Sequence, residues 1–453
     1  MTRDATELDD QIGQWRQYVE RSQTITPADI AEMEDHLRGQ IDDLTETGLA
    51  PDEAFLVAVK RMGSVDDISR EFAREHAERL WKQLVLSGAS GTDSPGIGRN
   101  LLVALGFAIA AAVTLKSAVT WLEGEHFGRN LALIVLPFVT GYLAWTRRLR
   151  PGAIAAVAAT YTIAALTMNF SPWRSTPSAP EATTEILAAT HLPILLWLVA
   201  GLAYVGGQWR SHGRRMDFIR FTGEWVVYLA LLALGGIVVT GLTIASFTTL
   251  GVADEDTIAS WIVPFGAAGA TVIAAWLVEA KQAVVENIAP VLTKVFTPIT
   301  LLLLVALLSA LAVRLDFADL ERDLLIIVDL ILALVLGLVL YAISARDPLA
   351  EPQVFDRLQF VLLAVALATD AVLLIAMITR IADAGFTANK VAALGMNLVL
   401  LVNLIGSTRL LARFNRGASP FSALERWQTG YLPVYGIWAA IVVFALPPMF
   451  SFA

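Results

Sequence analysis

Five side chains suited to ion binding or proton exchange lie inside long apolar stretches of the sequence. They are Lys116, His191, Asp329, Asp370 and Asn397. An ionisable group in hydrocarbon is unfavourable unless it is paired or hydrated, and such residues often belong to ion pathways or proton relays. These five residues therefore form the candidate intramembrane polar site.

Two interpretations of the site are open. In the first, the five residues line a polar cavity open to the outside. The outer loops would add four charged residues, Asp316, Asp319, Arg380 and Lys390. In the second, a single buried ion pair, Lys116–Asp370 or Lys116–Asp329, holds helices in register. The first interpretation is functional and the second structural.

The composition indicates what surrounds these residues. The 453-residue chain is 56% hydrophobic and only 17% charged, far from the globular average. It contains no Cys, which excludes disulfides, thiolate metal sites and a cysteine nucleophile. We therefore expect an all-α polytopic membrane protein.

Eleven stretches are apolar and long enough to cross the roughly 30 Å hydrocarbon layer. They are Leu101–Leu122, Leu131–Trp145, Gly152–Phe170, Ile186–Gly207, Trp225–Phe247, Ile258–Val278, Ile288–Val313, Leu324–Ser344, Leu358–Ile378, Val391–Ile405 and Tyr431–Phe450. With the N-terminus in the cytoplasm, the inner loops carry 14 Lys and Arg residues and the outer loops 6. The positive-inside rule thus predicts a cytoplasmic N-terminus and an outside C-terminus.

An acidic head precedes the spans. Residues 1–86 contain 19 Asp and Glu against 10 Lys and Arg, a balance of −9. Apolar residues recur at helical spacing, first in Leu8, Ile12, Trp15 and Val19. Further helices are predicted from Thr26 to Gly48, from Pro51 to Met62 and from Ser64 onward. We expect a small helical bundle at 1–86, a flexible linker at 87–98 and a transmembrane domain at 99–453.

The second predicted helix of the head carries a run of carboxylates. They are Glu32, Glu34, Asp35, Asp42 and Asp43. A solvated helix face is the ordinary interpretation of such a run. The charge excess of the head favours a second one, a docking face for a basic protein partner. The same excess argues against direct binding of nucleic acid.

Two segments of the head resemble a known family. EMEDHL (Glu32–Leu37) and GLAPDEAFLVAVKRMGSVDDISREF (Gly48–Phe72) are similar to the permease prefix domain, also described as the helix-turn-helix-associated alpha-helical signalling domain. Ala50 and Met62 depart from its Ser and Leu. The resemblance implies a cytoplasmic regulatory role beside a partner such as a PadR-like transcription regulator.

Two segments of the membrane domain resemble a second family. TRIADAGFTANKVAALGMNLVLLVNL (Thr379–Leu404) and NIAPVLTKVFTPITLLLL (Asn287–Leu304) are similar to the bacterial membrane family called domain of unknown function 4153. Phe386 and Lys390 stand where that pattern favours Leu and Arg. The resemblance implies a fold but carries no biochemical activity.

The sequence shows no phosphate-binding loop, dinucleotide fingerprint, HExxH or GxSxG motif. No enzymatic activity, metal or cofactor is therefore expected, and the expected partners are the lipid bilayer and a cytoplasmic protein. The first hypothesis is a signalling or regulatory membrane protein whose head docks that partner. The alternative is a secondary transporter driven by protons or ions, with Asp370 and Lys116 at its site.

Overall fold

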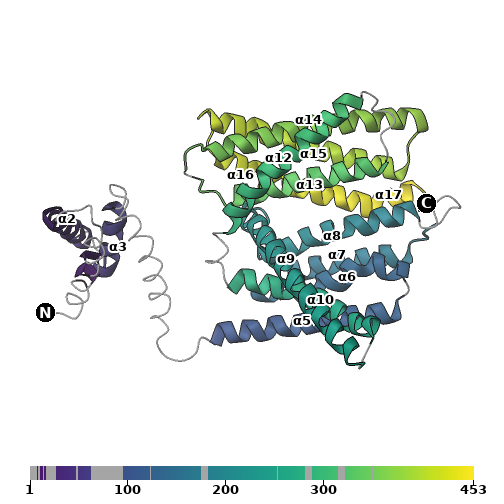
Figure 1. The fold of residues 1–453 in the computed structure, drawn as a ribbon, viewed down its shortest axis with the longest axis horizontal. Helices are drawn as coiled ribbons and strands as arrows, with labels where there is room; N and C mark the ends of the chain where they lie inside the picture. Colours follow the sequence, from purple (N-terminus) through teal and green to yellow (C-terminus); the bar gives the residue numbers. More distant parts are fainter. Residues whose placement is uncertain are drawn as a thin grey trace. The chain divides into compact units, whose positions relative to one another are not determined.

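The computed structural model of the chain separates into two compact units, Met1–Pro95 and Gly96–Ala453 (Figure 1). It describes residues 8, 11–13, 15–16, 27–46, 49–62, 95–122, 124–174, 182–251, 254–280, 288–314, 322–348 and 350–453. Each unit has its own hydrophobic core, and the two are described separately below.

The head is helical, as predicted. Helix α2 (Pro27–Glu46) and helix α3 (Pro51–Met62) each begin at a proline, which suits the first turn because its nitrogen needs no hydrogen-bond partner there. The described residues near Leu8 are helical too. Val19 and the predicted fourth helix lie outside the described residues. The core contains Ile12, Trp15, Leu37, Ile41, Leu44, Ala54, Phe55, Ala58 and Val59.

The membrane unit contains eleven helices that are long and apolar enough to span a bilayer, among the residues that the structure describes. They are α5 (Pro95–Trp121), α6 (Gly124–Thr146), α7 (Pro151–Phe170), α8 (Thr183–Tyr204), α9 (His212–Thr249), α10 (Glu255–Ala280), α12 (Ile288–Arg314), α13 (Arg322–Ser344), α14 (Val354–Ala384), α15 (Ala388–Asn415) and α16 (Ser422–Ala440). The last continues through a π-helical turn, Ile441–Ala445, into α17 (Leu446–Met449). The predicted all-α polytopic membrane fold is confirmed, span by span.

Several helices are longer than the predicted spans. Helix α9 begins at His212 instead of Trp225, and α15 ends at Asn415 instead of Ile405. Hydropathy marks only the apolar part of a helix, whereas backbone hydrogen bonding continues into the polar interface. For the same reason α5 begins at Pro95, so the last four residues of the predicted linker 87–98 are helical.

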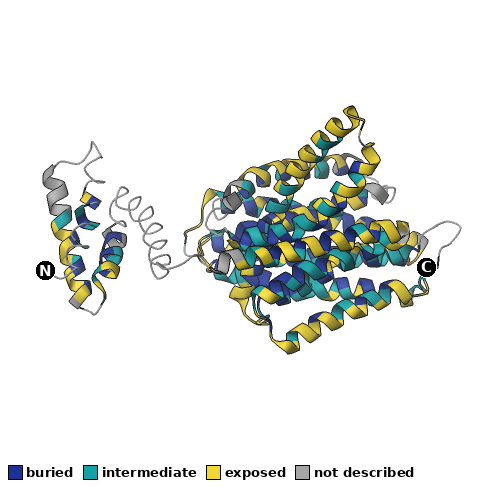
Figure 2. Cartoon of the chain, turned by 90° about the horizontal axis from the view of Figure 1, so that it is seen from below, coloured by how far each residue is buried: buried dark blue, intermediate teal, exposed yellow. Residues whose placement is uncertain are grey.

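The membrane unit packs around two main hydrophobic clusters. One joins α5 to α10, and the other joins α12 to α16 with the start of α9. Buried residues lie in the centre of the unit and exposed ones on its outside (Figure 2). The exposed side chains include many large apolar ones, as expected for a surface solvated by lipid.

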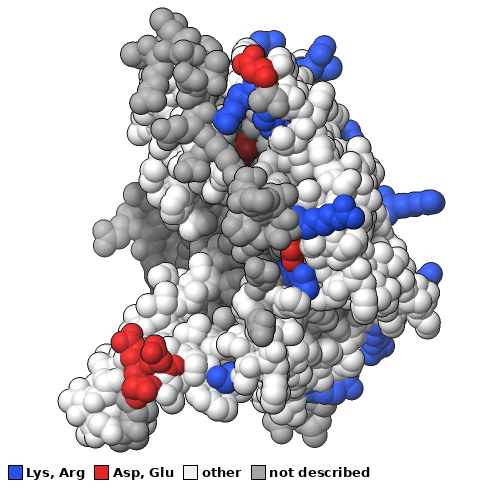
Figure 3. Space-filling model, turned by 90° about the vertical axis from the view of Figure 1, so that its right-hand side faces the viewer, with Lys and Arg blue, Asp and Glu red and all other residues white. Residues whose placement is uncertain are grey.

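The C-terminus is bonded to the connection between α7 and α8. The backbone N–H of Arg174 donates to the carbonyl of Phe452 at 2.8 Å, and that of Thr184 to the carbonyl of Ala453 at 3.0 Å. Figure 3 looks onto this end of the unit and shows a group of acidic side chains at one edge. Glu255 and Asp256 lie in the first turn of α10, and Asp254 directly precedes it. The start of α5 lies at the opposite end, as an odd number of spans requires (Figure 1).

Candidate functional site

Three of the five predicted site residues come together from three consecutive helices. Asp329 lies on α13, Asp370 near the middle of α14 and Asn397 on α15, and α14 packs against both neighbours. Asp370 and Asn397 are both 0% exposed, whereas Asp329 is half-buried. Their apolar helices therefore hold two carboxylates and one carboxamide inside the unit.

The three side chains interact with one another. Asn397 lies next to the carboxylate of Asp329, and the carboxylate of Asp329 lies near that of Asp370. Asn397 Nδ2 also donates to the carbonyl of Ala393 at 3.1 Å and to Met377 Sδ at 3.3 Å. These contacts fix the amide so that its oxygen is left as an acceptor.

The cluster has more acceptors than donors. Both carboxylate oxygens of Asp370, one of Asp329 and the amide oxygen of Asn397 are buried without a hydrogen-bond partner within the described residues. Neither carboxylate takes part in an ion pair in that part of the chain. Buried acceptors are almost always satisfied, so such a group needs protons or a cation.

Lys116 is not part of this cluster. Its Nζ donates to the carbonyl of Ser260 at 2.7 Å and lies 4.6 Å from the ring centroid of Trp261, both on α10. Helix α5, which carries Lys116, lies on the opposite side of the unit from α14 (Figure 1). The predicted Lys116–Asp370 or Lys116–Asp329 ion pair is therefore not formed, because α5 packs on α10 and gives the ammonium a carbonyl and an aromatic face instead.

His191 is also separate from the cluster. It lies half-buried on α8, where its Nδ1 donates to the carbonyl of Leu187 at 2.9 Å on the same helix. The outer-loop residues Asp316 and Asp319 lie outside the described residues. Lys390 Nζ donates to the carbonyls of Arg380 and Gly385, at 2.8 and 3.0 Å. Of the five predicted site residues, the structure thus groups only the three on α13 to α15.

Sequence reasoning missed a second polar cluster beside the first. Asn403 and Ser407 on α15 and Gln428 on α16 are all at most 1% exposed. Asn403 Nδ2 donates to Gln428 Oε1 at 3.0 Å, and Gln428 Nε2 donates to Ser407 Oγ at 2.6 Å. Their signal was available, since all three are polar residues in or beside predicted spans. Both amide oxygens of this cluster accept hydrogen bonds, so it links α15 to α16 and leaves no amide oxygen free for a ligand.

A polar cavity of about 240 Å³ lies among the ends of α6, α8, α9 and α10. Arg147 borders it and pairs with Glu279 at 3.1 Å, while its guanidinium lies 4.5 Å from the Tyr204 ring. Tyr142 also donates to Glu279, at 3.4 Å. The described residues contain no group of three or more His, Asp or Glu side chains that could hold a metal ion.

The predicted docking face on α2 is partly occupied by the head itself. Glu34 accepts from Arg16 and from Arg38, each at 3.1 Å. Asp35, Asp42 and Asp43 are exposed, and the side chain of Glu32 lies outside the described residues. Three of the five carboxylates therefore face solvent.

Comparison with known proteins finds no family model, no curated protein and no solved structure that matches this chain. The resemblances to the permease prefix domain and to the domain of unknown function 4153 therefore stay predictions.

Proposed function

We propose that this membrane protein is a proton- or cation-coupled secondary transporter whose coupling site is formed by Asp329, Asp370 and Asn397. The observation that carries the proposal is the buried carboxylate pair without a basic partner in the described part of the chain. Of the two functional hypotheses drawn from the sequence, this one has the more direct support from the geometry.

The physical argument concerns like charges in a medium of low polarity. Two ionised carboxylates that interact inside a helical bundle repel each other and have lost their hydration, so one proton or cation stabilises them. Asp370 lies near the middle of its helix, at the depth where secondary transporters hold coupling ions. A site that gains and releases a cation there changes the forces between α13, α14 and α15.

Infrared difference spectroscopy on the reconstituted chain tests the coupling site. A step to higher pH, or addition of Na⁺, is expected to remove a protonated-carboxyl band in the wild type. Asp370→Asn should abolish this change. Asp383→Asn is the matched control, because Asp383 is exposed near the end of the same helix. Its spectrum should match that of the wild type.

Vesicles that enclose a pH-sensitive dye then test coupling. An imposed Na⁺ or K⁺ gradient should change the internal pH through the wild type and not through Asp370→Asn. A wild-type spectrum that responds to neither pH nor cations would remove the coupling site. A spectral response without any cation-driven pH change would refute exchange of protons for these cations.

The head supports a second candidate function, the docking of a basic cytoplasmic protein. Its support is the group of three exposed carboxylates on α2, Asp35, Asp42 and Asp43. Replacing all three by Asn in the full chain should lower the yield of a cross-linked cytoplasmic partner. The control replaces the exposed Asp52 and Glu53 of α3 by Asn and Gln. Equal yields from the two variants would contradict docking through α2.

We also propose that the N-terminus faces the cytoplasm of a bacterial inner membrane. The basic loops support this orientation. Because the chain has no Cys, single Arg210→Cys and Arg174→Cys variants report the two sides without background. A membrane-impermeant thiol reagent added to intact cells should label only the second variant. Labelling of the first alone would reverse the orientation.

A further inference from the structure

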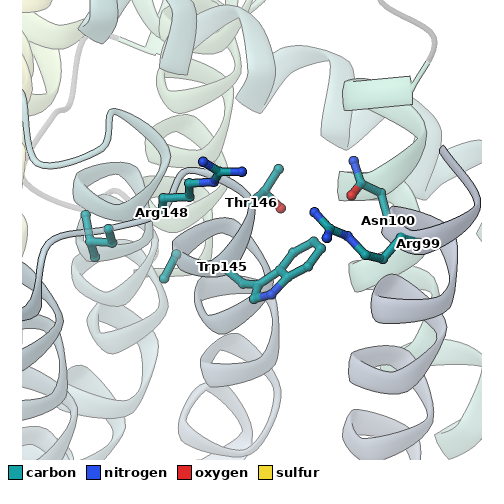
Figure 4. Close-up of a pocket in the computed structure, with 7 residues that line it drawn as sticks. Arg99, Asn100, Trp145, Thr146 and Arg148 are labelled. Carbon is teal, nitrogen blue, oxygen red and sulfur yellow. The ribbon is translucent and has the colours of Figure 1, made fainter. Parts of the chain in front are cut away.

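A groove unrelated to the carboxylate site opens between the start of α5 and the end of α6. It has a volume of about 720 Å³ and is lined by Arg99, Asn100, Ala144, Trp145, Thr146, Arg148 and Leu149. Arg99 and Arg148 point toward each other from the two sides of the groove, with the Trp145 indole beneath them (Figure 4). The lining thus combines two cations, an aromatic ring and an amide.

Among the described residues, the two guanidinium groups have no acidic partner. No Asp or Glu lines the groove, and neither Arg99 nor Arg148 forms an ion pair with any described residue. Both side chains are exposed, and the Arg99 guanidinium lies 5.8 Å from the centroid of the Trp145 ring. Guanidinium groups bind phosphate oxygens through paired N–H donors, so this groove suits a phosphate.

The backbone holds Arg148 at the edge of the groove. Its φ of 49° is left-handed, and its N–H donates to the carbonyl of Trp145 at 3.2 Å. The chain thus turns sharply after α6, which places one cation on each side of the opening. The Thr146 hydroxyl donates to the carbonyl of Tyr142 at 2.8 Å, which leaves the Asn100 amide and the Trp145 indole N–H as uncharged donors among the lining side chains.

Exposed apolar side chains come soon after the groove residues on α5. Leu102 is 70% exposed and Leu105 40% exposed, and both lie within two helical turns of Arg99. Trp145 is half-exposed, and Trp side chains favour the level of the lipid headgroups. A ligand with a phosphate at one end and hydrocarbon at the other fits both parts, whereas free phosphate would use only the cations.

We propose that this groove binds an anionic phospholipid, with the phosphate between Arg99 and Arg148 and the acyl chains along Leu102 and Leu105. Trp145 forms the base of the headgroup site, and Asn100 donates to a headgroup oxygen. Basic pockets between spans recognise anionic headgroups by this chemistry. The proposal is independent of the coupling site, which lies on other helices.

Native mass spectrometry of the full chain, released from nanodiscs with equal phosphatidylglycerol and phosphatidylcholine, measures the binding. The wild type should retain phosphatidylglycerol preferentially. The double variant Arg99→Gln and Arg148→Gln should bind it about thirtyfold more weakly, since each basic residue near an anionic surface contributes attraction. Arg210→Gln is the control, because Arg210 is an exposed arginine outside the groove. It should bind as the wild type does.

Three other outcomes would contradict the proposal. Equal retention of phosphatidylglycerol by wild type and double variant would place the lipid elsewhere. Equal retention of the two lipids by the wild type would exclude recognition of the anionic headgroup. Inorganic phosphate, added as a competitor, should not displace the lipid at millimolar concentration. Displacement by phosphate would identify a soluble anion as the ligand. The variants should keep the wild-type unfolding temperature, and an Arg99→Lys and Arg148→Lys variant should restore part of the binding.

Discussion

Helix α14 holds a buried carboxylate at its start and another near its middle, and the two are bonded in opposite ways. Asp356, at the start of α14, is 2% exposed and bonded on both oxygens. Arg346, which follows α13, donates through Nε to Oδ1 at 2.9 Å and through Nη2 to Oδ2 at 3.0 Å. Asp370 lies further along α14, is 0% exposed, and has neither oxygen bonded within the described residues.

The Arg346–Asp356 pair is a structural ion pair, which we call the Arg346 lock. Arg346 also donates to the carbonyls of Asp347, Ala350 and Glu351, and its guanidinium lies 4.7 and 4.5 Å from the rings of Phe414 and Phe421. The carboxylate of Asp356 accepts the N–H of Gln353 as well, at 2.7 Å. Helix α14 therefore carries a compensated carboxylate at the α13–α14 connection and, within the described residues, an uncompensated one near its middle.

Removing Arg346, which compensates the charge of Asp356, should have the largest effect on stability. Arg346→Gln leaves Asp356 buried beside a weak partner and is expected to lower the free energy of unfolding by about 3–5 kcal/mol, the range for a broken buried pair. Unfolding in mixed micelles measures it, with the exposed Arg357→Gln as control. Adding Asp356→Asn should recover part of the loss. A change no larger than that of the control would mean that the pair does not hold the connection.

A substitution that creates a steric clash tests the packing of α15, which must stay tight to keep its neighbours in place. A Cβ on Gly406 would overlap the indole ring of Trp427 on α16, and we expect Gly406→Ala to cost about 1–3 kcal/mol of stability. Gly235→Ala on α9 is the control, since no atom lies within 4 Å of the added Cβ. Thermal unfolding of the two variants should separate them clearly. Equal stability would indicate that α15 and α16 adjust freely.

Removing the uncompensated charge should have a smaller effect of opposite sign. Asp370→Asn eliminates a buried carboxylate without leaving any unpaired cation, so the free energy of unfolding should stay equal or rise by about 1 kcal/mol. The same unfolding assay as for Arg346→Gln gives the comparison directly. A loss as large as that of Arg346→Gln would show that Asp370 is compensated too, and the contrast between the two carboxylates would disappear.

The smallest effect concerns a carboxylate in water. Asp254 accepts hydrogen bonds from the side chain of Thr257 and from its backbone N–H, at 2.7 Å for the latter, and these bonds lower the pKa of Asp254. A lowered folded-state pKa stabilises the start of α10 above the ordinary pKa of 3.8 and loses that stabilisation as the pH falls through the folded value. Hydrogen-exchange protection there should decrease slightly below about pH 4. Asp254→Asn, which keeps the acceptor, should abolish the dependence, and a pH-independent wild type would contradict the assignment.

The spans could be predicted because length and hydropathy are local properties of the chain. The starts of α2 and α3 were predictable too, since Pro27 and Pro51 suit a first turn. The partner of Lys116 was not, because it depends on which face of α5 meets α10 and on the order in which helices pack. The Arg346 lock was missed for another reason. In the sequence, a loop arginine only indicates the orientation of the chain in the membrane. Its stacking on Phe414 can be recognised only in the three-dimensional structure.

The same distinction between local sequence properties and packing applies to the cluster of Asp329, Asp370 and Asn397. The sequence identified Asp329, Asp370 and Asn397 as unusual, since each interrupts an apolar run. It did not show that these three meet while His191 and Lys116 lie apart. Consecutive spans are usually neighbours, which favoured their meeting, but the rotation of each helix about its axis is set by packing that no local pattern encodes.

The length of α9 affects how the protein fits bilayers of different thickness. Its 38 residues correspond to roughly 57 Å at 1.5 Å per residue, nearly twice the hydrocarbon thickness of about 30 Å. It crosses the other helices obliquely (Figure 1), and its buried residues all lie between Arg215 and Glu224. Only the apolar part, Trp225–Phe247, has to match the hydrocarbon layer, and its 23 residues correspond to roughly 35 Å. A tilt accommodates the small excess, so we expect acyl-chain length to change the inclination of α9 and of α10, which packs against it.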